Sequence, residues 1–478
     1  MKTFFITTPI YYVNDTPHIG HAYTTIAADV IARWERLKGK NVFFLTGTDE
    51  NSSKTIKGAE KYGFKDVKKY TDKMAEKWKK VWNELNISFT DFIRTTQERH
   101  KKTVEAFFRR VWENGDIYKG KYAGLYCEGC EAFLTENELV NGLCPHHKTR
   151  PKVLTEENYF FRLSKYQEKL LVFMERNPEF VKPETRRNEV INLIKQGLKD
   201  ISISRPGLEW GIRVPVDKEH VFWVWFDALI NYISADPENW PADLHLMAKD
   251  ILRFHAIVWP AMLMSAGYEL PKRLFAHGFF TVNGEKISKS LGNAIDPVEI
   301  AKKYSVDALR YFLMREIPFG EDGDFSEEAL KKRINGELVS DLGNLVSRVL
   351  TLSERYKGQV KGRDEISEKL NFEKINSYME RLELHHALME IFSFIRAMNK
   401  YINEKEPWKM KGEELGKVLY NLLEGLRVVS VLLYPFMPET AEKITEQLGI
   451  EKRFDFSELS FKEFKGKPKK GEHLFEKV

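Results

Sequence analysis

The first residues of chemical interest are two histidines in the run His18-Ile19-Gly20-His21. An apolar run over 3–8 precedes them, and apolar residues spaced four apart over 22–34 follow them. The first pattern predicts a buried strand and the second one face of a helix, so the histidines lie in a strand-to-helix turn. A helix start attracts phosphate, Gly20 lets a ligand approach the backbone, and imidazoles donate to phosphate oxygens. The run therefore predicts ATP binding.

Considered alone, two histidines at a helix start are explained by a cap and a surface residue. A second cluster near residue 290 favours ATP binding instead. Ammonium groups in a loop can neutralise the charge that develops on a triphosphate as it is attacked. A solvated Lys/Ser loop is the alternative when this cluster is considered alone. We expect both clusters to meet at one triphosphate. The glycine-bounded run 284–293 contains Lys286, Ser288, Lys289 and Ser290.

Together the two runs resemble the HIGH and KMSKS signatures of class I aminoacyl-tRNA synthetases, with Ile287 replacing the usual methionine. The resemblance covers nearly the whole chain, and its finer motifs are similar to those of methionyl-tRNA synthetases. It implies ATP-dependent ligation of L-methionine to the 3′ end of tRNA(Met) through methionyl-adenylate, for translation initiation and elongation, with Mg²⁺ bound to ATP. The resemblance assigns catalysis to His18, His21, Lys286 and Lys289, and ATP binding to these four with Gly20, Ser288 and Ser290.

The same resemblance implies a pocket for methionine. Aromatic and aliphatic walls suit a flexible thioether, and sulfur packs well at ring edges. Asp49 would hold the amino group. Considered without the family, most of these residues are simply core. The implied positions are Ile10, Tyr12, Asp49, Trp225, Ala228, Leu229, Tyr232, Ile251 and His255.

The sequence departs from the family pattern at one place. Asn51 and Ser52 follow Asp49 and Glu50 where the family usually has His-Gly. Loss of a glycine constrains a turn, and loss of an imidazole removes a polar group near the amino acid. We therefore expect this departure to bear on activity and not on the fold.

All three cysteines of the chain lie within eighteen positions of each other. Cys127, Cys130, Cys144 and His147 form a C-x2-C-x13-C-x2-H pattern, which is ligand spacing for tetrahedral zinc. His146 is an alternative fourth ligand, and inert buried cysteines are the alternative to a metal site. Four protein ligands close the site, which predicts one structural Zn²⁺.

Length and patterning predict the domain organisation. A chain of 478 residues makes about three domains. The strand-helix-strand opening (3–8, 21–37 and 41–46) predicts a doubly wound, Rossmann-like α/β fold with a parallel sheet. We expect the run from His220 to Asp227 to resume this sheet as a buried strand. The predicted parts are residues 1–115 and 221–275 as the two catalytic halves, 116–220 as the connective insertion with the zinc knuckle, 276–335 as the KMSKS-loop linking domain, 336–465 as an all-α helix-bundle anticodon-binding domain, and 466–478 as a solvated tail.

In the helical region, Asn344 and Arg348 share a face, and Trp408 follows a proline at a helix start. The resemblance implies that these three residues read the CAU anticodon, by hydrogen bonds and by stacking on splayed bases. Capping or packing is the alternative for each alone. Some members of the family form a homodimer or use a separate tRNA-binding subunit, and the resemblance leaves both open for this chain.

Net charge and hydropathy limit the kinds of surface and the cellular location that we expect. With 75 Lys+Arg against 70 Asp+Glu, the charge of +5 confines any nucleic-acid surface to a local patch. Since no apolar run is long enough for a membrane span, we expect a cytoplasmic protein.

Other activities remain to be distinguished. Synthetases for valine, isoleucine or leucine would normally need a large editing insertion, and one for cysteine would place zinc ligands in the amino-acid site. A small-molecule nucleotidyltransferase shares the histidine motif without needing the knuckle or the helical region. A catalytically silent RNA-binding relative is the third alternative.

Overall fold

The computed structural model describes residues 3–130, 132–134, 136–145, 147–282, 284–287 and 294–478. Its centre is a six-stranded sheet in the order β3-β2-β1-β12-β13-β7, in which every neighbouring pair is parallel. The strand order reverses between β1 and β12, and open α/β sheets bind ligands at such a point. The predicted Rossmann-like sheet is confirmed. The strands are β1 (Phe4–Tyr12), β2 (Val42–Asp49), β3 (Asp91–Arg94), β7 (Val181–Lys182), β12 (Leu244–Ala248) and β13 (Leu274–His277).

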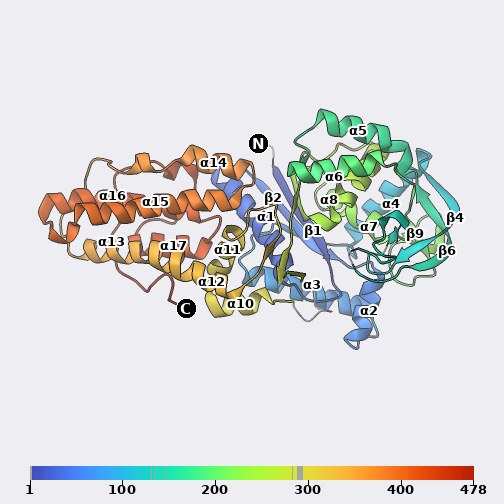
Figure 1. Cartoon of the computed structure of the whole chain (residues 1–478), viewed down its shortest axis with the longest axis horizontal. Coiled ribbons are helices and arrows are strands. Elements are labelled where there is room, and N and C mark those ends of the chain that lie inside the picture. Colours follow the sequence, from blue (N-terminus) through green and yellow to red (C-terminus); the bar gives the residue numbers. More distant parts are fainter. Residues whose placement is uncertain (1–2, 131, 135, 146, 283, 288–293) are drawn as a thin grey trace.

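Helices cover both faces of this sheet (Figure 1). Neighbouring residues of β1 show the division, because Phe5 belongs to the buried cluster that includes α4 and α9, whereas Ile6 belongs to the one that includes α1 and α3. Both side chains are fully buried, as a strand between two helical layers requires. The helices of this part are α1 (Ile19–Leu37), α2 (Ser53–Lys61), α3 (Val67–Glu84), α4 (Glu98–Glu113), α7 (Val224–Leu229), α8 (Asn231–Ala235) and α9 (Trp259–Ala266), with a 3-10 turn η3 (Lys249–Ile251) and a π-helical turn η4 (Phe254–Val258).

The insertion between α4 and α7 has sheets of its own. A four-stranded antiparallel sheet, β5-β4-β6-β8, carries the cysteine region, and a second small sheet has the order β10-β11-β9. The strands are β4 (Ile117–Cys127), β5 (Ala132–Leu134), β6 (Lys152–Phe161), β8 (Ile201–Ser202), β9 (Ser204–Pro206), β10 (Arg213–Val214) and β11 (Asp217–Phe222); the helical elements are η1 (Glu136–Glu138), η2 (Leu163–Tyr166), α5 (Gln167–Arg176) and α6 (Glu184–Lys195).

One strand prediction in this region is wrong. The run from His220 to Asp227 was expected to be one strand of the main sheet. The strand β11 ends at Phe222 and belongs to the small antiparallel sheet, and Val224 begins helix α7. A short apolar run fits a buried strand and a buried helix equally well, so periodicity could not separate them.

A linking segment joins the sheet to the helices at the other end of the molecule (Figure 1). It contains β14 (Phe280–Val282), β15 (Glu285–Lys286), β16 (Gly323–Asp324), α10 (Pro297–Tyr304), α11 (Val306–Arg315) and α12 (Glu327–Arg333). The helical part that follows contains η6 (Ile334–Gly343, π-helical), α13 (Asn344–Glu354), η7 (Ser367–Lys369), α14 (Phe372–Glu380), α15 (Leu384–Lys405), η8 (Pro407–Lys409), α16 (Gly412–Leu433), α17 (Pro438–Leu448) and η9 (Phe456–Glu458).

The C-terminal segment differs from the solvated tail expected over 466–478. The backbone N–H of Lys469 donates to the carbonyl of Gln447 on α17 at 2.8 Å, and that of Val478 donates to Asn335 Oδ1 at 2.9 Å. Leu474 and Phe475 pack against the main core. The segment is rich in lysine, which predicts a solvated tail. Its two apolar residues nevertheless hold it against the rest of the protein.

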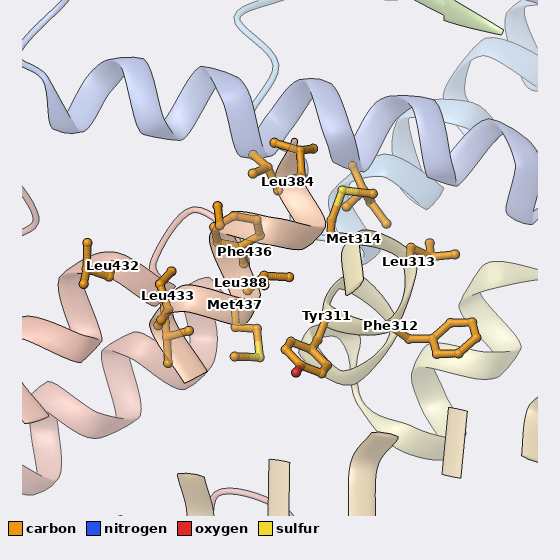
Figure 2. Close-up of a cluster of buried hydrophobic side chains, with 14 of the residues drawn as sticks. Tyr311, Phe312, Leu313, Met314, Leu384, Leu388, Leu432, Leu433, Phe436 and Met437 are labelled. Atoms are coloured by element: carbon orange, nitrogen blue, oxygen red, sulfur yellow. The ribbon is translucent and has the colours of Figure 1, made fainter. Parts of the chain in front are cut away.

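The helical part is joined to the sheet through a buried apolar cluster beside α1 (Figure 2). The cluster combines side chains of α11, the first turns of α15, the last turn of α16 and the connection from α16 to α17. Burial of such large side chains holds the linking segment and the helical part together. The labelled members are Tyr311, Phe312, Leu313, Met314, Leu384, Leu388, Leu432, Leu433, Phe436 and Met437.

Across the part of the chain that the structure describes, none of the helices combines the length and the apolarity that crossing a bilayer requires.

Candidate active site

A cavity of about 740 Å³ opens where β1 and β12 end, at the point where the strand order reverses. His18, Gly20 and His21 line it, and so does Ile287 from the lysine-bearing loop. All the residues that the resemblance assigns to methionine line the same cavity: Ile10, Tyr12, Asp49, Trp225, Ala228, Leu229, Tyr232, Ile251 and His255. The structure thus brings residues near the N-terminus and residues between 225 and 287 into one cavity.

The two histidines form the N-terminal cap of α1. His18 Nδ1 accepts from the backbone N–H of Gly20 at 3.1 Å, and His21 Nδ1 accepts from the backbone N–H of His18 at 3.2 Å. Their rings stack with centroids 3.8 Å apart. Because Nδ1 is the acceptor in each ring, the neutral imidazole carries its proton on Nε2. The cap therefore sets both rings in the tautomer that donates from Nε2.

Gly20 has a local reason as well as the ligand-related one expected from the sequence. A Cβ at this position would lie 2.9 Å from Cε1 of His18. The absence of a side chain therefore lets the capping imidazole fold over the first turn. The helix begins at Ile19, two residues before the start expected from the apolar spacing, since His18 supplies the cap.

The described residues on either side of the lysine-bearing run lie at the cavity and at the same helix start. The backbone N–H of Ile19 donates to the carbonyl of Ile295 at 3.0 Å, directly beyond the loop. Ile287 is buried at the cavity wall, and Lys286 belongs to strand β15. Ser288, Lys289 and Ser290 lie outside the described residues. One flank of the loop, Ile287, thus lines the cavity, and the other, Ile295, contacts the start of α1.

The apolar end of the cavity has a buried polar pair in its wall. His255 lies in the π-helical turn η4, and its Nδ1 donates to the carbonyl of Ile251 at 3.0 Å. Its Nε2 is therefore the acceptor for the hydroxyl of Tyr232, at 2.7 Å. Burial lowers the pKa of His255 to about 4, so the ring is neutral at pH 7. Trp225 stacks on Phe254 at 4.0 Å and completes an uncharged wall.

Asn51 and Ser52, the residues that depart from the family pattern, fit this structure without strain. Ser52 has φ −120° and ψ 160°, an extended conformation open to any residue, so the turn does not need glycine. Asn51 Nδ2 donates to Asp227 Oδ2 at 2.8 Å, and His100 Nε2 contacts Asp227 Oδ1 at 2.5 Å. Replacement of the family's glycine by Ser52 therefore does not strain the backbone of this turn.

Asp227 therefore has the partners that a buried carboxylate needs. Its side chain is fully buried on α7, the helix that also carries Trp225, Ala228 and Leu229. Sequence reasoning missed His100, because a single histidine within a helix pattern gives no local signal of a contact 127 residues away. Lys54 and His277, which also line the cavity, were missed for the same reason.

The predicted metal ligands lie together. Donor atoms of Cys127, Cys130, Cys144 and His147 all lie within 4.8 Å of one another. Cys130 Sγ is 3.5 Å from Cys144 Sγ and 3.3 Å from His147 Nδ1. Ligands of a tetrahedral zinc ion lie roughly 3.5 Å apart, given bonds of about 2.0–2.3 Å. The donor set thus has the chemistry and spacing to bind a metal, and His146, the alternative ligand, lies outside the described residues.

In the helical part, Asn344 begins α13 immediately after the π-helical segment η6, and Arg348 follows one turn later. Arg348 Nη2 donates to Asn403 Oδ1 at 2.8 Å, which ties α13 to the end of α15. Trp408 lies five residues beyond Asn403, and 43% of its surface is exposed. A tryptophan with this exposure offers a surface on which a base can stack.

Comparisons with known proteins agree with this geometry. The family model described as "tRNA synthetases class I (M)" matches residues 4–150 and 146–350, and "Anticodon-binding domain of tRNA ligase" matches 369–477. The chain is 49% identical to a methionine–tRNA ligase of Caldanaerobacter subterraneus, over 100% of this chain and 79% of that protein. It is also 49% identical to the ligase of Thermotoga maritima, over 94% and 76%.

A solved structure supports the same family. The methionyl-tRNA synthetase of Mycobacterium tuberculosis, in complex with methionyl-adenylate, superposes with a TM-score of 0.94 at 40% identity, covering 99% of this chain and 100% of that one. Fold, cavity and helical part together define a class I aminoacyl-tRNA synthetase. Within that class, the chain belongs to the methionine–tRNA ligase family.

Proposed function

We propose that this cavity joins L-methionine to ATP as methionyl-adenylate and then passes the methionyl group to the 3′ end of tRNA(Met). The observation that carries the proposal is the shared chamber: the histidine cap and Ile287 line the same cavity as the uncharged wall of Tyr232 and His255. A triphosphate at the cap would thus lie beside an amino acid whose thioether contacts the apolar wall. The proposal covers tRNA charging for initiation and elongation in the cytoplasm.

In the first step, a methionine carboxylate oxygen attacks the α-phosphorus of ATP. The new bond is the acyl–phosphate bond of the adenylate, and the bond to pyrophosphate breaks. No side chain needs to act as a nucleophile, so positioning and charge stabilisation provide the catalysis. We assign the Nε2–H groups of His18 and His21, and the ammonium groups of Lys286 and Lys289, to the phosphate oxygens.

The remaining ATP contacts follow from the same loop and helix start. Gly20 gives access to the backbone, and the hydroxyls of Ser288 and Ser290 are assigned to phosphate oxygens. Mg²⁺ bound to ATP would neutralise phosphate charge and orient the leaving pyrophosphate. In the second step, a terminal ribose hydroxyl of tRNA attacks the methionyl carbonyl carbon and AMP leaves.

The amino acid is positioned by uncharged walls and one carboxylate. Asp49 is assigned to the methionine ammonium group, because it lines the cavity at the end of β2. The neutral pair of Tyr232 and His255 is assigned to the thioether, since a charged imidazole would be costly beside sulfur. Ile10, Tyr12, Trp225, Ala228, Leu229 and Ile251 provide the apolar contacts.

Zinc is the metal that the knuckle's three thiolates and one imidazole would suit best, with a structural role. The described core of this part contains only Cys127, Leu134 and Cys144, so a bound ion would replace the apolar core that it lacks. The tRNA partner is assigned to the helical part, where Asn344, Arg348 and Trp408 would contact splayed anticodon bases.

Exchange of pyrophosphate into ATP, measured with each of the twenty amino acids in turn, tests this function. We expect exchange with methionine alone. Exchange with a different amino acid would redirect the assignment within the class, and no exchange with any of them would favour a catalytically silent RNA-binding relative.

A further inference from the structure

One lysine links the metal-binding knuckle to the wall of the amino-acid cavity. Lys54 lies in the first turn of α2 and lines the cavity. Its Nζ donates to the backbone carbonyl of Gly129 at 2.7 Å, and the same ammonium lies 4.4 Å from the ring centroid of Tyr12. Tyr12 ends β1 and also lines the cavity. The ammonium therefore bridges a knuckle carbonyl and an aromatic cavity wall.

The accepting carbonyl belongs to the turn that presents two of the metal ligands. Gly129 lies between Cys127 and Cys130, and a Cβ there would be 2.4 Å from Cγ of His147. The peptide of Gly129 therefore lies directly against the fourth ligand. Movement of the ligands on loss of the metal would displace the carbonyl that Lys54 holds.

A second contact joins the knuckle region to another wall of the same cavity. Arg253 Nη1 donates to Glu138 Oε1 at 2.7 Å, and Glu138 lies in the segment between Cys130 and Cys144. Arg253 stands between Ile251 and His255, both of which line the cavity. Because 43% of the Arg253 side chain is exposed, this ion pair contributes less than the Lys54 contact.

We propose that the knuckle clamps two walls of the amino-acid cavity, with Lys54 and Arg253 as positioning residues. Metal binding at the knuckle and methionine binding in the cavity are therefore coupled. This inference rests on the proposed function, because it takes methionine as the ligand of the cavity. Coupling of two binding equilibria is reciprocal: if the metal tightens methionine binding, methionine tightens metal binding by the same factor.

The test measures zinc affinity by chelator competition, with and without saturating methionine, on the full chain. We expect methionine to tighten zinc binding about fivefold in the wild-type chain, the size that one hydrogen bond supports. Lys54→Met keeps the length of the side chain but loses the donor, so the ratio should fall towards one while one zinc per chain is retained. Arg253→Met should lower the ratio less.

Steady-state exchange kinetics give an independent measure. Lys54→Met should raise the methionine KM about fivefold and leave kcat and the ATP KM near their wild-type values. Lys54→Arg should restore the methionine KM, because a guanidinium can donate to the carbonyl and stack on Tyr12. Lys152→Met is the matched control, since it removes the exposed ion pair with Glu128 on the same knuckle.

The inference is overturned if zinc affinity does not depend on methionine in the wild-type chain, or if Lys54→Met leaves the coupling and the methionine KM unchanged. A wild-type chain that does not bind methionine at all would instead overturn the proposed function. If Lys54→Met fails to fold, Arg253→Met decides the question by the same ratio: an unchanged ratio in that variant overturns the inference.

Discussion

Arg310 of α11 donates from Nη2 to Asp29 Oδ2 of α1 at 2.7 Å, and both side chains are fully buried. Arg310 also donates to the carbonyls of Pro435 and Phe436, each at 2.9 Å. Burial raises the pKa of Asp29, but Arg33 and Arg310 outweigh it and hold this pKa at about 2. One guanidinium therefore connects the histidine-bearing helix, the linking segment and the helical part.

Arg310→Met should destabilise the protein strongly. The substitution keeps much of the side-chain volume but leaves Asp29 with fewer compensating charges, which costs about 3 kcal/mol or more for a buried pair. The midpoint of urea unfolding measures the loss. The double variant Asp29→Asn with Arg310→Met should recover a large part of it, and equal losses in both variants would mean that packing, not charge, sets the cost.

His21→Asn separates the capping role of this residue from its chemical role. The amide oxygen of asparagine can take the place of Nδ1 and accept from the backbone of His18, whereas nothing replaces the Nε2 donor. We expect kcat for pyrophosphate exchange to fall by about 10²–10³, as on loss of one transition-state donor, with little change in unfolding midpoint.

His21→Ala provides the comparison for this prediction, because it loses both the cap and the donor. It should show a similar loss of kcat together with a lower unfolding midpoint. The free energy of unfolding should fall by about 1 kcal/mol, the contribution of one helix cap. An asparagine variant that keeps wild-type kcat would remove His21 from the catalytic set.

Trp408→Ala should weaken tRNA charging and spare adenylate formation. Stacking of one base on an aromatic ring contributes about 1–3 kcal/mol, so kcat/KM for tRNA should fall roughly tenfold or more. Pyrophosphate exchange without tRNA should keep its wild-type rate. Trp112, which is 38% exposed on α4, provides the control position. Equal charging by wild type and Trp408→Ala would contradict the anticodon assignment.

Stability should decrease as the pH falls below 6.5. Burial lowers the pKa of His255 and of His277 to about 4, from the usual 6.5. The unfolded chain therefore binds protons first, and the stability present above pH 6.5 is lost as the pH falls towards 4. Each histidine should cost about 2 kcal/mol at pH 5.

Urea unfolding at pH 7 and pH 5 measures this loss. His277→Asn should flatten the pH dependence by the share of one histidine, because asparagine does not titrate. If the stability of this variant decreased between pH 7 and pH 5 as much as that of the wild type, groups other than His277 would be responsible for the loss. His255 is the less suitable position for this test, since it is assigned to the methionine thioether and its substitution would also remove the hydrogen bond with Tyr232.

Local patterns were sufficient to predict the elements that bear the chemistry. The spacing of apolar residues predicted β1 and α1, and the spacing of Cys127, Cys130, Cys144 and His147 predicted a ligand cluster that the structure brings together. These features depend on residues close in sequence, so periodicity and turn chemistry carry enough information.

Features that depend on distant contacts could not be predicted in this way. The link between Asn51, Asp227 and His100 joins residues up to 176 positions apart. Likewise, the region expected to be a helix bundle contains a break between α14 and α15, where Leu382 adopts a positive φ of 61°. A leucine in that conformation is uncommon and leaves no trace in the hydrophobic pattern.

The short strand β7 lies within the insertion yet pairs with β13 at the edge of the central sheet. A variant that excised the whole insertion would leave the main-chain groups of β13 unpaired along that edge. Such an edge is a template for association with another chain. Minimised versions of this enzyme should therefore retain Val181–Lys182, or they will tend to self-associate even when the chamber itself is intact.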